Sequence, residues 1–143
     1  MGNTYKNSLS ISTDTGNLQM MRDFLADCIF KSGMVPQEWQ NKITLAVDEA
    51  VSNIIEHGYQ DEAEGIVDLH IEAALDKFSV IIFDSGKSFD PDEVEDVNIQ
   101  DHVTTAKTGG LGIFIMRRIM DEISYTFKES ERNELKMVKY FKE

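Results

Sequence analysis

The spacing of apolar residues predicts amphipathic helices in the first half of the chain. Apolar side chains recur at intervals of three or four positions at Leu18, Met21, Leu25 and Cys28. Asp14 or Thr15 is expected to cap this first helix, and Gly33 to end it in the left-handed conformation. Pro36 is well placed as the first residue of a second, longer helix that runs to about His57.

The second half of the chain is predicted to hold one more helix and most of the strands. A helix is expected to open at the glycine-rich segment 109–112 and to end near Glu122. Alternating or continuous apolar runs predict five strands, at 8–12, 67–75, 78–83, 123–128 and 135–141. We expect a polar turn around Arg132 and Asn133 between the last two. The aperiodic segment at about 87–110 predicts a long loop, and loops of this length are often lids.

These elements predict an α+β fold: a two-layer α/β sandwich whose mixed, mostly antiparallel sheet has helices on one face. A chain of 143 residues has room for one domain, and the core is expected to span about 8–142. No apolar run approaches the ~18 residues of a membrane span, and the first residues lack the features of a signal peptide. We therefore expect a cytoplasmic protein. The single cysteine, Cys28, excludes an internal disulfide and is expected to pack in the core.

The net charge limits the function. It is −12, from 26 acidic and 14 basic residues, so the surface repels nucleic-acid phosphate and direct nucleic-acid binding is disfavoured. A nucleotide such as ATP is also anionic. If one binds, a divalent cation and oriented backbone amides must offset the repulsion locally.

Polar residues share one face of the second predicted helix. Glu49, Asn53 and His57 are four positions apart and stack on a face different from the apolar stripe. Glu49 is our candidate general base, although an isolated helical glutamate is more often a solvated surface acid. The amide oxygen of Asn53 suits Mg²⁺, which prefers oxygen ligands and keeps several waters. Asp48 is a second candidate base, but a rotation of ~100° around the helix points it elsewhere.

Two further segments have features of a binding site. Asp84 ends a strongly apolar strand at Asp84-Ser85-Gly86, where burying an ionised carboxylate without a donor is costly, so a partner is expected. Glycines 109, 110 and 112 precede a helix, and exposed amides at a helix N-terminus bind phosphate without many cationic side chains.

The three segments together resemble the N, G1 and G2 boxes of the GHKL ATPases, which share the Bergerat fold and include gyrase, a heat-shock chaperone ATPase, histidine kinases and MutL. Segments 48–59, 84–91 and 108–114 have the order and separation of these boxes. Within the superfamily the chain is most similar to anti-sigma factor serine/threonine kinases. The features that carry this similarity are the glutamate four positions before the asparagine, His-Gly-Tyr at 57–59, Phe-Asp-Pro at 89–91 and Met-Asp-Glu at 120–122.

The resemblance implies ATP and Mg²⁺ as cofactors and assigns roles to residues. Glu49 is the implied catalytic residue, Asn53 binds the metal and the nucleotide, and the Asp84 carboxylate accepts the adenine amino group. The remaining implied nucleotide contacts are Gly86, Thr108, Gly109, Gly110, Leu111 and Gly112. Lys107 also precedes the glycines and is a weaker candidate for a phosphate contact.

The resemblance also implies partners. These are a STAS-type anti-anti-sigma protein, which the kinase phosphorylates, and a sigma factor, which it sequesters; related kinases form homodimers. Two departures stand out. Ser88 replaces the second glycine of the longer Asp-x-Gly-x-Gly motif, and strand 135–139 lacks the threonine that relatives often place beside the adenine aspartate, which puts the second polar contact to adenine in doubt.

Other interpretations remain open from the sequence. A nucleotide-dependent protein-binding module with little or no kinase activity would need the same pocket. The catalytic half of a histidine kinase fits less well, because the chain is too short to add a dimerising phospho-acceptor helix pair. The simplest alternative is an α+β domain that binds no nucleotide.

Overall fold

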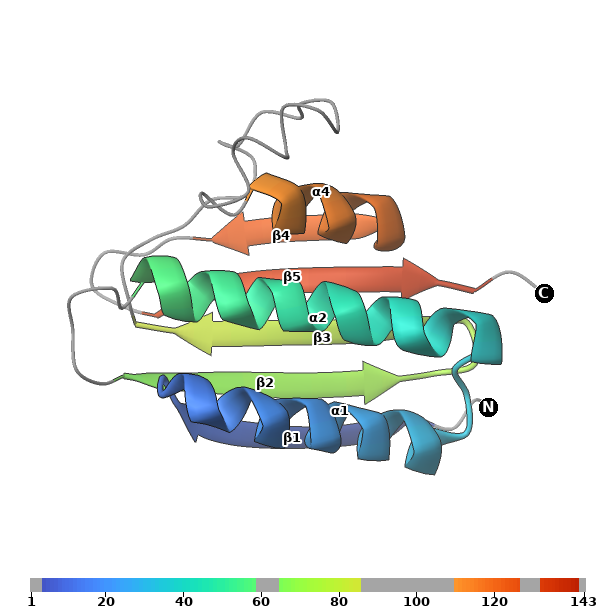
Figure 1. Cartoon of the computed structure of the whole chain (residues 1–143). Coiled ribbons are helices and arrows are strands. Elements are labelled where there is room, and N and C mark those ends of the chain that lie inside the picture. Colours follow the sequence, from blue (N-terminus) through green and yellow to red (C-terminus); the bar gives the residue numbers. More distant parts are fainter. Residues whose placement is uncertain (1–3, 59–64, 86–109, 127–131, 142–143) are drawn as a thin grey trace.

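The fold is an open antiparallel sheet with its helices on one face (Figure 1). The computed structural model describes residues 4–58, 65–85, 110–126 and 132–141. Its strands are β1 (Tyr5–Ser12), β2 (Ile66–Ala73), β3 (Lys77–Asp84), β4 (Glu122–Thr126) and β5 (Asn133–Tyr140). They lie in the order β1-β2-β3-β5-β4, and each neighbouring pair is antiparallel. The predicted α+β two-layer sandwich is confirmed, and the described strands form antiparallel pairs only.

The helices form the second layer. They are α1 (Leu18–Ser32), which follows a short 3-10 turn η1 (Thr15–Asn17), α2 (Gln37–Gly58) and α4 (Gly110–Ile119). In Figure 1, α1 covers β1 and β2, α2 crosses β3 and β5, and α4 lies over β4. α2 and α4 pack side by side and run in opposite directions, so the beginning of α4 lies beside the second half of α2.

The alternation of apolar and polar residues along a strand gives the sheet one buried and one exposed face. In β2, Val67 and Leu69 are fully buried under the helices, whereas Asp68 and His70 point to the opposite face. The predicted continuation of this strand to residue 75 is wrong. Leu75 is 71% exposed because β2 ends at Ala73 and the chain turns back into β3, with the Ala74 N–H donating to the Lys77 carbonyl.

The helix ends agree with the sequence at some positions and differ at others. Gly33 ends α1 in the left-handed conformation, with φ 64°, as predicted. The residue at the N-cap of α1 is Asn17, not Asp14 or Thr15. Asp14 instead accepts a hydrogen bond from the Gly16 N–H at 2.9 Å, which tightens the preceding turn. α4 ends at Ile119, earlier than expected, because β4 already begins at Glu122.

Cys28 lies in the core, as predicted. Its side chain is fully buried on α1, and burial is the main cause that raises the pKa of its thiol. Low thiolate content and lack of access make this cysteine chemically inert.

Across the described ranges, no helix combines the length and the apolar character that crossing a bilayer requires.

Candidate functional site

The predicted site residues that the structure describes lie where four elements meet at one end of the molecule. β3 ends there, β5 begins there, and the second half of α2 lies beside the start of α4 (Figure 1). This arrangement follows from the antiparallel pairing, which places Asp84, at the end of β3, directly opposite Asn133, at the start of β5.

Glu49, Asn53 and Gly112 come together across the seam between α2 and α4. The two side chains lie one helical turn apart on α2 and both face Gly112. A methyl group added at Gly112 would lie 2.6 Å from Oε2 of Glu49 and 2.9 Å from Nδ2 of Asn53. Gly112 therefore provides the space that these two polar groups occupy, and any larger residue would displace them.

The side chain of Asn53 is buried, and its amide nitrogen lacks a hydrogen-bond acceptor among the described residues. Its side chain is only 3% exposed, and within the described residues Nδ2 has no hydrogen-bond partner. An unsatisfied buried amide typically costs about 1–3 kcal/mol, so such a group in a folded protein calls for an explanation. A polar ligand that supplies the missing contact is the explanation that its position beside Glu49 favours.

The environment of Glu49 makes it a stronger base than an ordinary glutamate. Burial has the largest effect and raises the pKa of Glu49, and the negative charges of Asp48 and Glu56 raise it further. The carboxylate lies on the same face of α2 as Asn53, as the helical spacing predicted, and the packing of α4 brings Gly112 against both. A half-buried acid with a raised pKa beside an unsatisfied amide is typical of a functional site rather than of a solvated surface.

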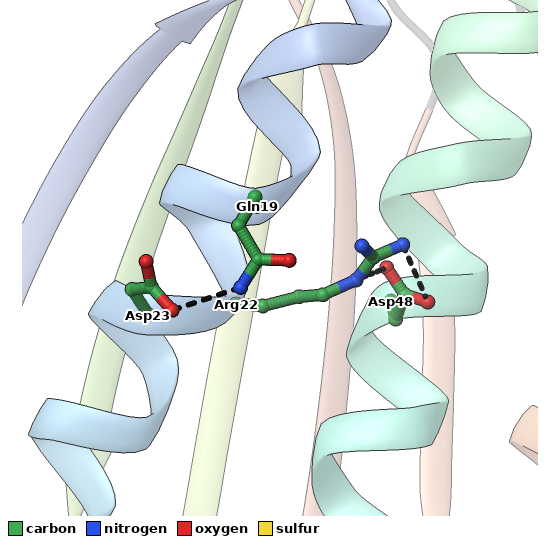
Figure 2. A network of polar contacts seen from close by, with 4 residues as sticks. All are labelled: Gln19, Arg22, Asp23 and Asp48. Carbon is green, nitrogen blue, oxygen red and sulfur yellow. Dashed lines mark hydrogen bonds and ion pairs between the residues drawn. The ribbon is translucent and has the colours of Figure 1, made fainter.

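Asp48, the second candidate base, has a different structural role. Its two carboxylate oxygens accept hydrogen bonds from Arg22 on α1, at 2.9 Å from Nε and 3.2 Å from Nη2 (Figure 2). On the same helix as Arg22, Gln19 donates to Asp23 at 2.9 Å. The ~100° rotation between consecutive residues thus directs Asp48 to α1 and Glu49 to α4. The pairing argues against Asp48 as a base.

Asp84 is buried at the end of β3, and its partner is one that the sequence analysis missed. The Asp84 side chain is 3% exposed, and its Oδ1 accepts a hydrogen bond from Asn133 Nδ2 at 3.1 Å. Asn133 does not belong to the predicted polar turn around Arg132 and Asn133, because it is the first residue of β5 and is itself 2% exposed. The sequence indicated this role of Asn133 only weakly, because a polar residue next to Arg132 is typical of a turn.

Asn133 also bears on the missing threonine of the last strand. A polar side chain does stand beside the buried aspartate, but it lies two residues before Leu135, where the expected strand began. The amide nitrogen donates to the Asp84 carboxylate and so helps to hold that carboxylate in place.

The remaining candidates have limited structural description. Gly86, Thr108 and Gly109 lie outside the described residues, as do Lys107 and most of the predicted lid. Gly110 and Leu111 form the start of α4, so the helix begins at the glycine-rich segment, as expected. His57 lies in the last turn of α2. Over the described ranges, no group of three or more His, Cys, Asp and Glu side chains is positioned to hold a metal.

Comparisons with known proteins show the family to which the chain belongs. Residues 11–139 match the family described as histidine kinase-like ATPase domain. Over 103 residues the chain is 34% identical to the serine-protein kinase RsbW of Staphylococcus epidermidis and 33% identical to that of Staphylococcus aureus; each match covers 68% of this chain and 64% of the relative. The chain thus spans slightly less than two thirds of the length of these curated relatives.

A solved structure has a similar fold. It is the crystal structure of the RsbU and RsbW domains of Rv1364c from Mycobacterium tuberculosis, with a TM-score of 0.60 over 93% of this chain and 32% of that chain. The sequence identity is 16%, so this likeness concerns the fold alone.

Proposed function

The chain belongs to the family of histidine kinase-like ATPase domains, and on that premise we propose that it is an ATP- and Mg²⁺-dependent serine/threonine kinase acting as an anti-sigma regulatory factor. One observation carries the proposal. Glu49 and the unsatisfied amide of Asn53 meet at Gly112, on the seam between the two helices that frame the site. The similarity to the two serine-protein kinases supports the reaction type.

The residues present suit a magnesium nucleotide. The amide of Asn53 offers an oxygen to a hard cation, and this ion would also offset the repulsion between the triphosphate and a chain of net charge −12. The backbone N–H groups at the start of α4, from Gly110 to Gly112, favour phosphate through hydrogen bonds and the helix dipole. The buried Asp84 carboxylate would accept a hydrogen bond from the amino group of a purine base.

We assign one role to each residue of the site. Glu49 orients the substrate hydroxyl and takes its proton, for which its raised pKa is favourable. Asn53 holds the metal, and Asn133 holds the Asp84 carboxylate in place by donating to Oδ1. Mg-ATP, when bound, would supply the phosphoryl group and leave as ADP, while Mg²⁺ would neutralise the negative charge that develops during transfer. Gly86, Thr108, Gly109 and Leu111 remain proposed nucleotide contacts.

We further propose that the substrate is a serine or threonine of a STAS-type anti-anti-sigma protein and that a sigma factor is the alternative partner. In this role residues 1–143 act as one cytoplasmic ATPase domain, and a homodimer is the expected assembly. These assignments rest on the resemblance of segments 48–59, 84–91 and 108–114 to anti-sigma kinases.

A phosphotransfer assay tests the proposal. The purified protein is incubated with radiolabelled ATP, Mg²⁺ and the STAS protein encoded nearest to it, with Glu49→Ala as the inactive control. We expect label on the STAS protein only with the unsubstituted kinase. Absence of transfer, combined with ATP-dependent partner binding that Glu49→Ala retains, would support a nucleotide-dependent binding module instead.

A further inference from the structure

A second surface lies on the same two helices as the candidate site, but at their other end. Between the first turns of α2 and the part of α4 from Phe114 onward is a hollow of about 390 Å³. It is lined by Trp39, Lys42, Phe114, Ile115, Arg118 and Ile119, which we call the α2–α4 groove. The floor is apolar, and the two cations stand on opposite helices.

The cations of the α2–α4 groove are directed at aromatic rings and not at acids. Lys42 Nζ lies 4.6 Å from the centre of the Trp39 ring, and the Arg118 guanidinium carbon lies 5.3 Å from that of Phe114. Within the described part of the chain neither cation forms an ion pair, whereas Arg22 and Arg132 each pair with an aspartate. In a chain with 26 acids and 14 bases, two cations that have no acidic partner among the described residues can pair with a carboxylate of another protein.

Trp39 is fixed before any partner arrives. Its ring rests on Lys139, whose Nζ lies 3.7 Å from the ring centre. Lys139 is 8% exposed and is itself held by Asp121 at 3.4 Å. An aromatic platform that is already ordered loses little conformational entropy on binding, which is a property of strong contact residues in protein interfaces.

We propose that the α2–α4 groove docks a protein segment that presents a bulky apolar side chain flanked by carboxylates, most simply one face of an acidic amphipathic helix. The apolar side chain fills the hollow beside Trp39 and Phe114, and the carboxylates pair with Lys42 and Arg118. This mode follows the general pattern of helix recognition by a groove. Because the chain has a net charge of −12, cations beside an apolar hollow favour this position for an acidic segment.

The groove and the candidate site both lie along the seam between α2 and α4. Lys42 precedes Glu49 by seven residues, or roughly 10 Å along the helix. A protein held in the α2–α4 groove is therefore close enough to offer a side chain to Glu49. To this extent the proposal rests on the proposed function, although docking itself needs neither nucleotide nor phosphotransfer.

The test uses Trp39 as its own reporter, because it is the only tryptophan of the chain. The probe is a synthetic amphipathic peptide of about 18 residues, or five helical turns, with leucine on one face and glutamate on both flanks. A matched peptide has lysine in place of each glutamate. We expect the glutamate peptide to shift Trp39 emission saturably, and the lysine peptide to leave the emission unchanged.

Charge reversal on the protein completes the test. Lys42→Glu and Arg118→Glu are each expected to weaken peptide binding by about tenfold or more, and the effect should shrink at high salt. Lys136→Glu is the matched control, because this lysine is exposed on the opposite face of the sheet. Circular dichroism confirms that each variant is folded. No saturable shift with the glutamate peptide, equal binding of the two peptides, or equal effects of Arg118→Glu and Lys136→Glu would overturn the proposal.

The docking and kinase proposals can fail separately. Glu49→Gln is expected to abolish phosphotransfer and to leave peptide binding unchanged. If Arg118→Glu lowers peptide affinity while the protein shows no transfer to any STAS substrate, the docking proposal is supported and the kinase proposal is contradicted.

Discussion

Gly112 lies so close to Glu49 that the two helices carrying them leave no room for even one methyl group between the backbone of α4 and the carboxylate. An added Cβ would stand 2.6 Å from Oε2, well inside van der Waals contact, and the atoms in its way are side-chain ends and not backbone. A residue larger than glycine would therefore move the functional groups and spare the fold.

Gly112→Ala separates function from stability. We expect phosphotransfer to fall by about 100-fold, because a displacement of roughly 1 Å at a catalytic group costs that much. The free energy of unfolding should change by no more than about 1 kcal/mol, because the higher helix propensity of alanine offsets the displacement of the two side chains. Transfer rates and urea unfolding measure the two effects. Gly16→Ala is the control, because its Cβ meets Asp14 at an ordinary 3.4 Å; equal transfer by both variants would contradict the proposed site.

Glu49→Gln is expected to reduce transfer by about 10²- to 10⁴-fold, the usual contribution of a general base. It should also stabilise the protein near neutral pH. The folded state raises the pKa of Glu49, chiefly by burial, so it holds this proton more tightly than the unfolded chain does. In the unsubstituted protein, the stabilisation that protonated Glu49 provides is complete below the ordinary carboxyl pKa. It is lost as the pH rises through the raised pKa, because the carboxylate is then charged and half-buried.

Thermal unfolding at two pH values checks this sign. Glutamine carries no charge, so the Tm of Glu49→Gln should exceed that of the unsubstituted protein at about pH 7, and the difference should narrow at about pH 4. A variant less stable than the original at about pH 7 would show that the ionised carboxylate has a stabilising partner.

Asp48→Asn tests whether the neighbouring carboxylate is structural. The change weakens the contact with Arg22 and should lower the free energy of unfolding by about 1 kcal/mol or less, as expected for a partly exposed pair. Transfer should stay within about threefold of the original. A loss of transfer as large as that of Glu49→Gln would restore Asp48 as a candidate base.

Asn133→Leu removes a donor from the buried Asp84 carboxylate. We expect a loss of about 1–3 kcal/mol in stability, and weaker ATP binding because the carboxylate is no longer oriented. Isothermal titration with ATP and Mg²⁺ measures the affinity. Asn133→Thr, which keeps a hydroxyl donor, should recover part of it; equal affinities for all three proteins would exclude a positioning role.

Local spacing accounts for the parts of the site that could be predicted from sequence. Glu49 and Asn53 share a face because four residues make about one helical turn, and this holds in any fold. Asp84 ends a run of buried residues, so its burial and its need for a donor were also visible. The two-layer architecture could be predicted because the spacing of apolar residues distinguishes the helices from the strands.

Contacts between distant segments could not be predicted in this way. The approach of Gly112 to Glu49 depends on how α4 packs on α2, and the Arg22–Asp48 pair joins residues 26 positions apart. The partner of Asp84 depends on strand register, which sets Asn133 opposite it. A difference of two residues in the start of β5 changed Asn133 from a turn residue into a buried one.

The strand order affects when parts of the site can form as the protein folds during synthesis. β5 inserts between β3 and β4, so Asp84 acquires its Asn133 donor only after 49 further residues have been synthesised. Closing so long an intervening stretch is slow compared with forming a hairpin such as β2–β3. During translation the Asp84 end of the proposed nucleotide site is therefore completed late. If the protein binds nucleotide as proposed, a nascent chain should gain resistance to proteolysis from nucleotide only once the β5 segment has left the ribosome.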